Sequence, residues 1–162
     1  MKQQIYQQIR NLLESSRYGV LIINLINQLV TGIVYMIYPL FLFYLAYYQD
    51  LRFWNSLLIP ALSFFLVSWF RRIINAPRPY EVFNQPPLIG KNTLGKSFPS
   101  RHVFSAFVIA TTIYPIFSWL GLLLMLSGLL LAIVRVLGGV HFWRDVIVGA
   151  LLGLAFGFIN WL

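Results

Sequence analysis

Residues 135–145 read RVLGGVHFWRD and place a cation, an imidazole and a carboxylate between two strongly apolar runs. Ionisable groups at membrane depth are unfavourable, so they usually face a polar cavity or the water interface and serve a function there. His141 and Asp145 are four residues apart, so they share one face if a helix begins near Val140. The carboxylate can then accept the imidazole N–H, an arrangement that suits a nucleophilic or basic histidine.

The composition of the chain is that of an integral membrane protein. Of its 162 residues, 59% are hydrophobic and only 10% are charged, and the mean hydropathy is +0.76, values far from those of a soluble globular domain. The formal net charge of +8 favours anionic lipid headgroups or phosphates as partners, and we expect no nucleic acid to bind. Cysteine is absent, which excludes a disulfide framework and a thiolate metal site.

The apolar runs predict an all-α, polytopic membrane helix bundle of about five spans, with residues 1–162 forming a single membrane-embedded domain. The first span lies in the uncharged run of residues 18–48, which is longer than the roughly 20 residues needed to cross the hydrocarbon core. We expect the remaining spans at residues 53–70, 102–120, 122–137 and 146–162.

The first 17 residues predict an amphipathic helix rather than a cleaved signal peptide. Apolar residues recur at helical spacing at Ile5, Ile9, Leu12 and Leu13, with Gln, Arg and Glu on the other face. This pattern is typical of a helix that lies in the membrane interface, and a simple polar leader is the alternative. The segment lacks the continuous apolar core and cleavage site of a signal peptide, so we expect it to be retained.

The order of the spans predicts that two polar segments meet at one face of the membrane. The first is the 71–101 loop, which is rich in Pro, Asn, Gly and Lys and is the expected active-site loop. The second span exits into this loop, the third starts from it, and the fourth returns to the same side, where the 135–145 turn leads into the fifth. The residues gathered at this face are His102, His141, Asp145, Arg71, Arg78, Arg101 and Arg135.

These residue types describe a site for a multiply charged anion. Phosphate fits best, because planar guanidinium groups bind its oxygens in a bidentate manner. His102 and His141 lie near the expected starts of two helices, where backbone N–H groups and the positive ends of the helix dipoles face the same pocket. One histidine for attack and one for proton transfer suffice for phosphomonoester cleavage, so we expect neither a metal nor a cofactor.

Three motifs, in this order, resemble the signature of the type 2 phosphatidic acid phosphatase family, the membrane lipid phosphatases related to vanadium haloperoxidases. They cover residues 71–145, with order and internal spacing intact. The motifs are Arg71-x6-Arg78-Pro79, Pro99-Ser100-Arg101-His102 and Arg135-x5-His141-x3-Asp145.

The resemblance implies a role for each of these residues. His141 would attack phosphorus to form a phosphohistidine, and Asp145 would orient and stabilise its ring. His102 would protonate the leaving alkoxide and then activate the water that releases phosphate. The remaining motif residues would bind phosphate, the arginines through its oxygens and the serine through a hydrogen bond. This phosphate-binding set comprises Arg71, Arg78, Ser100, Arg101 and Arg135.

Three positions depart from the family pattern. Arg71 stands where the first motif usually opens with Lys, which keeps the charge but changes the donor geometry. Arg101 replaces the usual Gly of the second motif, where it either favours a more anionic headgroup or a diphosphate, or restricts access. Val134 replaces a usual Ser, so one hydroxyl contact to phosphate is missing.

The sequence therefore predicts a metal-independent lipid phosphatase whose substrate tail enters sideways between helices. The candidate substrates are undecaprenyl diphosphate, phosphatidylglycerophosphate and phosphatidate. Two alternatives stay open: a lipid phosphotransferase, and a catalytically silent protein that binds or translocates anionic lipids.

Two indications disagree about which side of the membrane carries the site. Counting cations, among them Lys91 and Lys96, favours the cytoplasm. Members of the resembled family mostly face outward or into a lumen, and catalytic arginines inflate the count. We expect a bacterial plasma membrane with the site on the outward face.

Overall fold

The computed structural model describes residues 3–90 and 93–161, and within these ranges the chain forms helices and no strands. The predicted all-α bundle is confirmed. Lys91 lies outside the described residues, as does Leu162 at the end of the expected fifth span. The elements are α1 (Gln3–Ser15), α2 (Gly19–Tyr47), α3 (Phe53–Ile74), α4 (Pro79–Val82), α5 (Arg101–Ile113), α6 (Ser118–Leu137), α7 (Trp143–Phe158) and a final 3-10 turn, η1 (Ile159–Trp161).

Within the described residues, four segments are long and apolar enough to cross a membrane: Gly19–Tyr47, Phe53–Val82, which contains α3 and α4, Ser118–Leu137 and Trp143–Trp161. Large apolar side chains such as Phe65 project outward from them and stay exposed. Such faces are stable against lipid tails but unfavourable in water, which agrees with a membrane protein.

Helix α5 is the exception, because its 13 residues extend only about 20 Å and do not reach across a hydrocarbon core of about 30 Å. The expected third span over residues 102–120 is interrupted near Pro115, which has no N–H to donate to the carbonyl of Thr111. The indole N–H of Trp161 donates to that carbonyl instead, at 3.1 Å.

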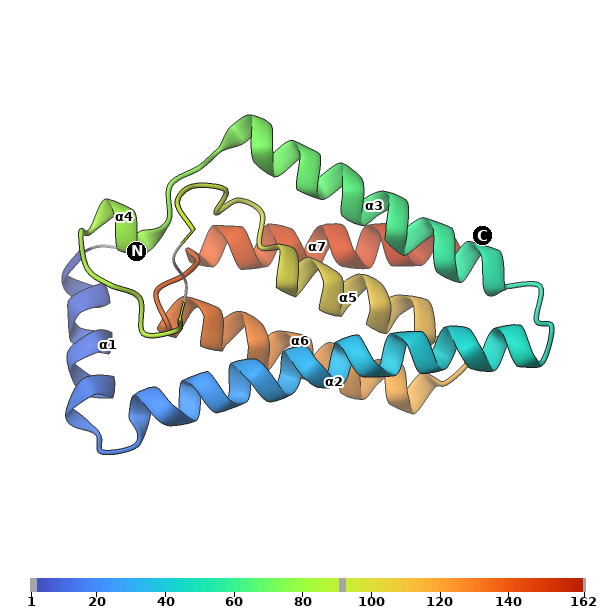
Figure 1. The fold of residues 1–162 in the computed structure, drawn as a ribbon, viewed down its shortest axis with the longest axis horizontal. Coiled ribbons are helices and arrows are strands. Elements are labelled where there is room, and N and C mark those ends of the chain that lie inside the picture. The colour runs from blue at the N-terminus through green and yellow to red at the C-terminus, as the bar shows by residue number, and fades with distance from the viewer. Residues whose placement is uncertain (1–2, 91–92, 162) are drawn as a thin grey trace.

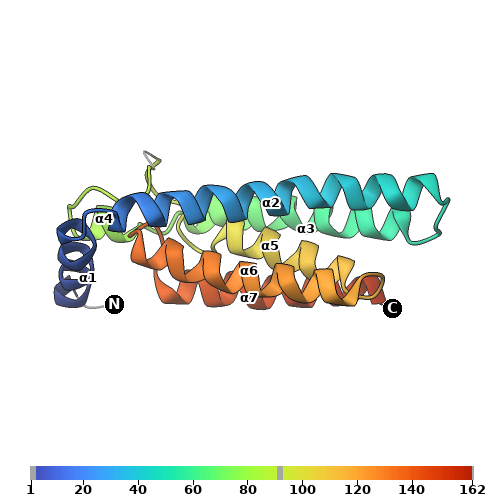
Figure 2. The same ribbon diagram turned by 90° about the horizontal axis from the view of Figure 1, so that it is seen from below.

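Helix α5 lies inside the bundle, with all residues from Val103 to Ile113 buried. Figure 2 shows it between α2 and α3 on one side and α6 and α7 on the other. The long helices and α5 still run in alternating directions, so the two polar segments end on the same side, as the sequence predicts (Figure 1).

Glycine residues of α7 lie in direct contact with α5. A Cβ atom at Gly149 would lie 2.7 Å from the carbonyl oxygen of Ser100, and one at Gly153 would lie 2.6 Å from the Cβ of Phe107. Both distances are too short for a side chain, so glycine allows α7 to pack directly against the backbone of α5. The start of α7 is thereby placed beside the start of α5, where the candidate site residues lie.

Helix α1 lies across the end of the bundle that carries these residues (Figure 1). Tyr6 is buried there, and its ring lies tilted against that of Phe83, with ring centroids 5.0 Å apart. Arg10 donates to the carbonyl of Pro86. Helix α1 therefore packs against the part of the loop at residues 83–86, while its placement in the membrane interface stays a prediction.

Candidate active site

The 71–101 loop and the 135–145 turn meet at one end of the bundle, as predicted. The backbone N–H of Ser100 donates to the carbonyl of Asp145 at 2.8 Å, and that of Leu88 donates to the carbonyl of Gly138 at 3.1 Å. These two bonds hold residues far apart in sequence side by side, so the segments that carry the second and third motifs come together at this end of the bundle.

Two buried guanidinium groups hold the loop in place. Arg71, in the last turn of α3, donates to the carbonyls of Lys96 and Pro99. Arg78, just before α4, donates to the carbonyls of Gly95 at 2.9 Å and Val140 at 3.0 Å. A guanidinium group has five N–H donors and no acceptor, so both residues present to this region only groups that bind anions or carbonyl oxygens.

Arg78 is positioned by an acid that the sequence reading left without a role. One carboxylate oxygen of Glu81 accepts the backbone N–H groups of Arg78 at 3.1 Å and of Gly95 at 2.8 Å. Glu81 therefore joins the start of α4 to the part of the loop that Arg78 contacts.

Arg135 connects the site to α2 and α5. It is buried in the last turn of α6, and its Nη1 donates to Oδ1 of Asn27 at 2.9 Å. Its Nη2 lies 3.0 Å from Nδ1 of His102. The sequence reading missed Asn27, although a polar amide within an uncharged membrane run is itself a signal of a buried polar contact.

His141 is fully buried and precedes α7 rather than lying in it. The chain turns at Gly139, whose φ is +74°, and Phe142 is extended, so the helix begins at Trp143 and not near Val140. His141 and Asp145 therefore do not share a helical face in the expected way. Their closest approach, from Nδ1 to Oδ2, is 3.6 Å, which is longer than a hydrogen bond.

Ser97 lies between the two, a contact that sequence reasoning missed. Its hydroxyl donates to Oδ2 of Asp145 at 2.5 Å and lies 3.4 Å from Nδ1 of His141. Oδ2 also accepts the backbone N–H of Phe142 at 3.0 Å. Ser97 is fully buried, and its hydroxyl lies between the carboxylate and the imidazole. Because the hydroxyl proton is donated to Asp145, a hydrogen bond to His141 requires the imidazole proton on Nδ1. Nothing in the sequence around Ser97, five residues before His102, indicates this contact.

Burial lowers the pKa of His141 well below its ordinary range near 6.5, and the neighbouring Asp145 carboxylate only partly opposes this shift. The ring is therefore neutral at physiological pH. A neutral imidazole has a ring nitrogen with an available lone pair, which a nucleophile or base requires.

The residues of the second motif lie at the start of α5. Ser100 is buried at the N-cap, and its hydroxyl has no hydrogen-bond partner among the described residues. Arg101 is exposed, with its guanidinium 5.1 Å from the ring centroid of Phe64. His102 is partly buried beside Arg135. The second motif therefore places Ser100 in the interior of the site and Arg101 at its exposed edge.

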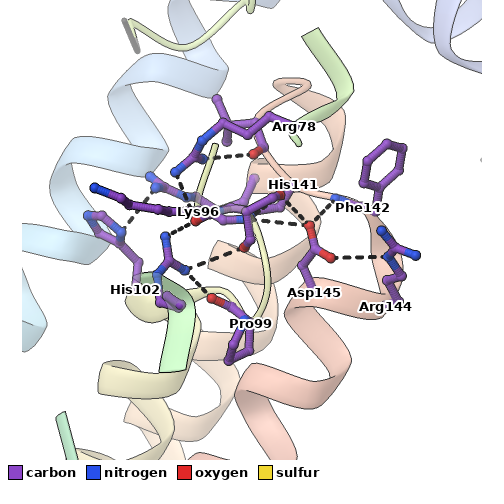
Figure 3. A network of polar contacts seen from close by, with 12 residues as sticks. Arg78, Lys96, Pro99, His102, His141, Phe142, Arg144 and Asp145 are labelled. Carbon is purple, nitrogen blue, oxygen red and sulfur yellow. Dashed lines mark hydrogen bonds and ion pairs between the residues drawn. The ribbon is translucent and has the colours of Figure 1, made fainter. Parts of the chain in front are cut away.

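The two histidines belong to one polar network (Figure 3). The backbone N–H of His141 donates to the carbonyl of Arg135 at 3.3 Å, and the side chain of Arg135 contacts His102. Val134, at the position where the family usually has Ser, is buried in an apolar cluster with Ile23 and Val140. It contributes packing where a hydroxyl would contribute a polar contact.

Among the described residues, no three His, Cys, Asp or Glu side chains lie close enough together to hold a metal ion. Metal-independent chemistry stays a prediction.

The fold and the site together define an all-helical membrane protein with guanidinium and imidazole groups gathered at one end of the bundle. Residues 52–162, more than half of the chain, match the family model of the PAP2 superfamily. The chain therefore belongs to the PAP2 superfamily, in agreement with the resemblance of its three motifs.

Solved structures extend the likeness to nearly the whole chain. The crystal structure of Aquifex aeolicus LpxE is similar over 98% of this chain and 93% of that chain, with 28% sequence identity and a TM-score of 0.76. The PAP2-type phosphatidylglycerolphosphate phosphatase of Bacillus subtilis is similar over 98% of this chain and 83% of that one, with 22% identity and a TM-score of 0.68. None of the curated protein sequences compared with the chain is significantly similar to it.

Proposed function

We propose that this protein is a membrane lipid phosphatase that removes phosphate from a lipid mono- or diphosphate through a phosphohistidine at His141. The observation that carries the proposal is the buried arrangement of His141, Ser97 and Asp145 beside Arg135 and His102. Membership in the PAP2 superfamily and the likeness to a lipid phosphate phosphatase fold support it. Undecaprenyl diphosphate, phosphatidylglycerophosphate and phosphatidate are the candidate substrates.

In the first step, Nε2 of neutral His141 forms a bond to phosphorus, and the bond from phosphorus to the lipid oxygen breaks. The imidazole gains positive charge as this bond forms, and the buried carboxylate of Asp145 stabilises that charge. Ser97 transmits the interaction because its hydroxyl lies between the two groups. Oδ2 of Asp145 is held in place by Ser97 and by the backbone of Phe142, so little reorganisation is needed.

His102 supplies the proton for the leaving oxygen. Arg135 donates toward its Nδ1, so in this arrangement the ring proton lies on Nε2. An imidazolium is the stronger acid, and its second proton would lie on Nδ1, so Arg135 turns from Nδ1 toward a phosphate oxygen when substrate binds. Binding of the phosphate thus prepares His102 for protonation. In the second step, His102 takes a proton from the water that attacks the phosphohistidine.

Arg71, Arg78 and Arg135 hold the phosphate oxygens. The first two donate to main-chain carbonyls of the loop, and an ionised phosphate is a stronger acceptor than a carbonyl. The buried Ser100 hydroxyl is a further donor at the start of α5. These groups stabilise the charge that develops on phosphorus during transfer.

The test is phosphate release from the three candidate lipids by the purified protein in detergent micelles with EDTA. We expect release to continue in EDTA and to fall at least about 100-fold in His141→Ala and His102→Ala. Ser127→Ala is the control, because Ser127 is half-buried in α6 and its hydroxyl donates to the carbonyl of Leu123 within the same helix, away from the site. Thermal unfolding of each variant checks that the fold is intact.

Other outcomes separate the alternatives. Lipid binding without phosphate release by the wild-type protein would support the silent lipid-binding alternative. Transfer of the phosphoryl group to a second lipid, with little free phosphate, would support a phosphotransferase. Undiminished release in His141→Ala would overturn the proposed nucleophile.

A further inference from the structure

A pocket of about 230 Å³ lies beside the polar network, between the end of α3, the loop at residues 93–96 and the start of α5. Of its nine lining residues, five are arginines or lysines and none is acidic. These cations are Arg71, Arg72, Arg78, Lys96 and Arg101. Two of them, Arg71 and Arg78, also belong to the proposed phosphate site, so the pocket directly adjoins that site.

Among the described residues, the other three cations, Arg72, Lys96 and Arg101, have no acidic partner. The ion pairs within the described ranges involve other cationic residues, and Arg72, Lys96 and Arg101 are all exposed. Gathering like charges around a small volume is unfavourable unless an anion neutralises them. This pocket therefore carries more positive charge than a single phosphate bound at Arg71 and Arg78 would require.

The pocket is also held in shape. The Lys96 carbonyl accepts hydrogen bonds from both Arg71 and Arg78, which fixes the loop from which the Lys96 side chain projects (Figure 3). The Arg101 guanidinium lies over the Phe64 ring, a cation–π contact that orients it without neutralising its charge. The backbone at Lys96 and the side chain of Arg101 are therefore held at the pocket before an anion binds.

We propose that this pocket binds a second phosphoryl group of the headgroup, and that Arg72, Lys96 and Arg101 make the protein prefer lipid diphosphates to lipid monophosphates. The inference rests on the proposed phosphatase function. The terminal phosphoryl group would be held beside His141 by Arg71 and Arg78. The second phosphoryl group, one bridging oxygen away, would lie in the pocket that the same two arginines border.

The pocket then acts on the leaving group. As Nε2 of His141 bonds to the terminal phosphorus, the bond from that phosphorus to the bridging oxygen breaks, and its electron pair stays on the bridging oxygen. The lipid monophosphate leaves with this added negative charge, which the three cations stabilise before His102 supplies a proton. Water then releases inorganic phosphate and restores His141.

The test compares farnesyl diphosphate with farnesyl monophosphate, which share one lipid tail, in detergent micelles with EDTA. We expect the wild-type kcat/KM to favour the diphosphate, and the ratio of the two values to fall about tenfold in Arg101→Gln and in Lys96→Gln. Arg101→Lys, which keeps the charge, should retain most of the preference. Arg17→Gln is the matched control, because Arg17 is an exposed cation over the Tyr18 ring and lies outside the pocket. Its ratio should equal that of the wild type.

A second measurement does not need catalysis. Inorganic diphosphate should raise the unfolding temperature of His141→Ala more than inorganic phosphate at equal concentration, and Arg101→Gln in the same background should remove the difference. If the free anion shows this effect but the lipid diphosphate is not preferred, the pocket takes free anions and the headgroup inference is wrong. Equal hydrolysis of both lipids, with a ratio unchanged in the variants, would also overturn it while leaving the phosphatase function intact. Absence of hydrolysis of these two lipids and of the three candidate lipids would instead refute the phosphatase function, and the binding measurement would still decide the pocket.

Discussion

Replacing Ser97 by Ala is the sharpest test of how His141 is supported. The variant removes the 2.5 Å hydrogen bond to Oδ2 of Asp145 and the 3.4 Å contact to Nδ1 of His141. Asp145 keeps the N–H of Phe142, but His141 is then 3.6 Å from the nearest carboxylate oxygen, too far for a hydrogen bond. A buried hydrogen bond to a charged group contributes about 1.5–3 kcal/mol, so we expect kcat/KM to fall about 10- to 100-fold.

The assay is phosphate release from a defined lipid phosphate in micelles, with kcat and KM measured separately. Because the charge on His141 develops only in the transition state, kcat should fall while KM changes little. Ser63→Ala is the matched control, since Ser63 is also buried but its hydroxyl donates to the carbonyl of Pro60 within α3, at 3.1 Å. It should retain full activity.

A double-mutant cycle separates a positioning role from a general loss of packing. If Ser97 acts through Asp145, Ser97→Ala should have little further effect in an Asp145→Asn background. Independent effects that multiply, or a Ser97→Ala variant whose kcat/KM stays within about twofold of wild type, would refute the proposed bridge.

Two further predictions concern pH and orientation. Burial lowers the pKa of His141, so below pH 6.5 this residue binds more protons in the unfolded chain than in the folded one. The free energy of unfolding should therefore fall by up to about 2 kcal/mol between pH 6.5 and pH 5. Thermal unfolding should show a smaller loss in His141→Asn, and equal losses would contradict the lowered pKa. Labelling of single cysteines reports which face of the membrane carries the site. One cysteine replaces Leu94, which is exposed in the loop, and the other replaces Asn55 at the opposite end of the bundle. In intact cells an impermeant thiol reagent should label the Leu94→Cys variant and not the Asn55→Cys variant, whereas the reverse would place the site in the cytoplasm.

The meeting of the two polar segments could be predicted from the sequence because membrane topology leaves few choices. Each long apolar run must form a helix, since unpaired backbone groups are too unfavourable in hydrocarbon. Helices joined by short turns reverse direction, so His102 and His141 had to lie at the same end. The three motifs then identified the residue types and the family without any distance.

The bonds within the site could not be predicted in this way. The turn at Gly139 makes α7 begin at Trp143 and not earlier in the chain. Small shifts in this turn decide whether the Asp145 carboxylate contacts an imidazole or a hydroxyl. Ser97 reaches Asp145 across 48 residues of sequence, and no local spacing encodes that approach. Likewise, the short length of α5 is tolerated because its surroundings are protein and not lipid.

The sequence by itself determined the class of protein, the helical architecture, the end of the bundle that carries the site and the chemical character of that site. Composition and hydropathy act through the membrane environment, and they restrict every helix at once. Only the tertiary structure decided the order of contacts from His141 through Ser97 to Asp145, the pairing of Arg135 with Asn27, and the cation-lined pocket around Arg101. Hydrogen bonds and pockets depend on distances between distant segments, and these distances exist only once the helices have packed.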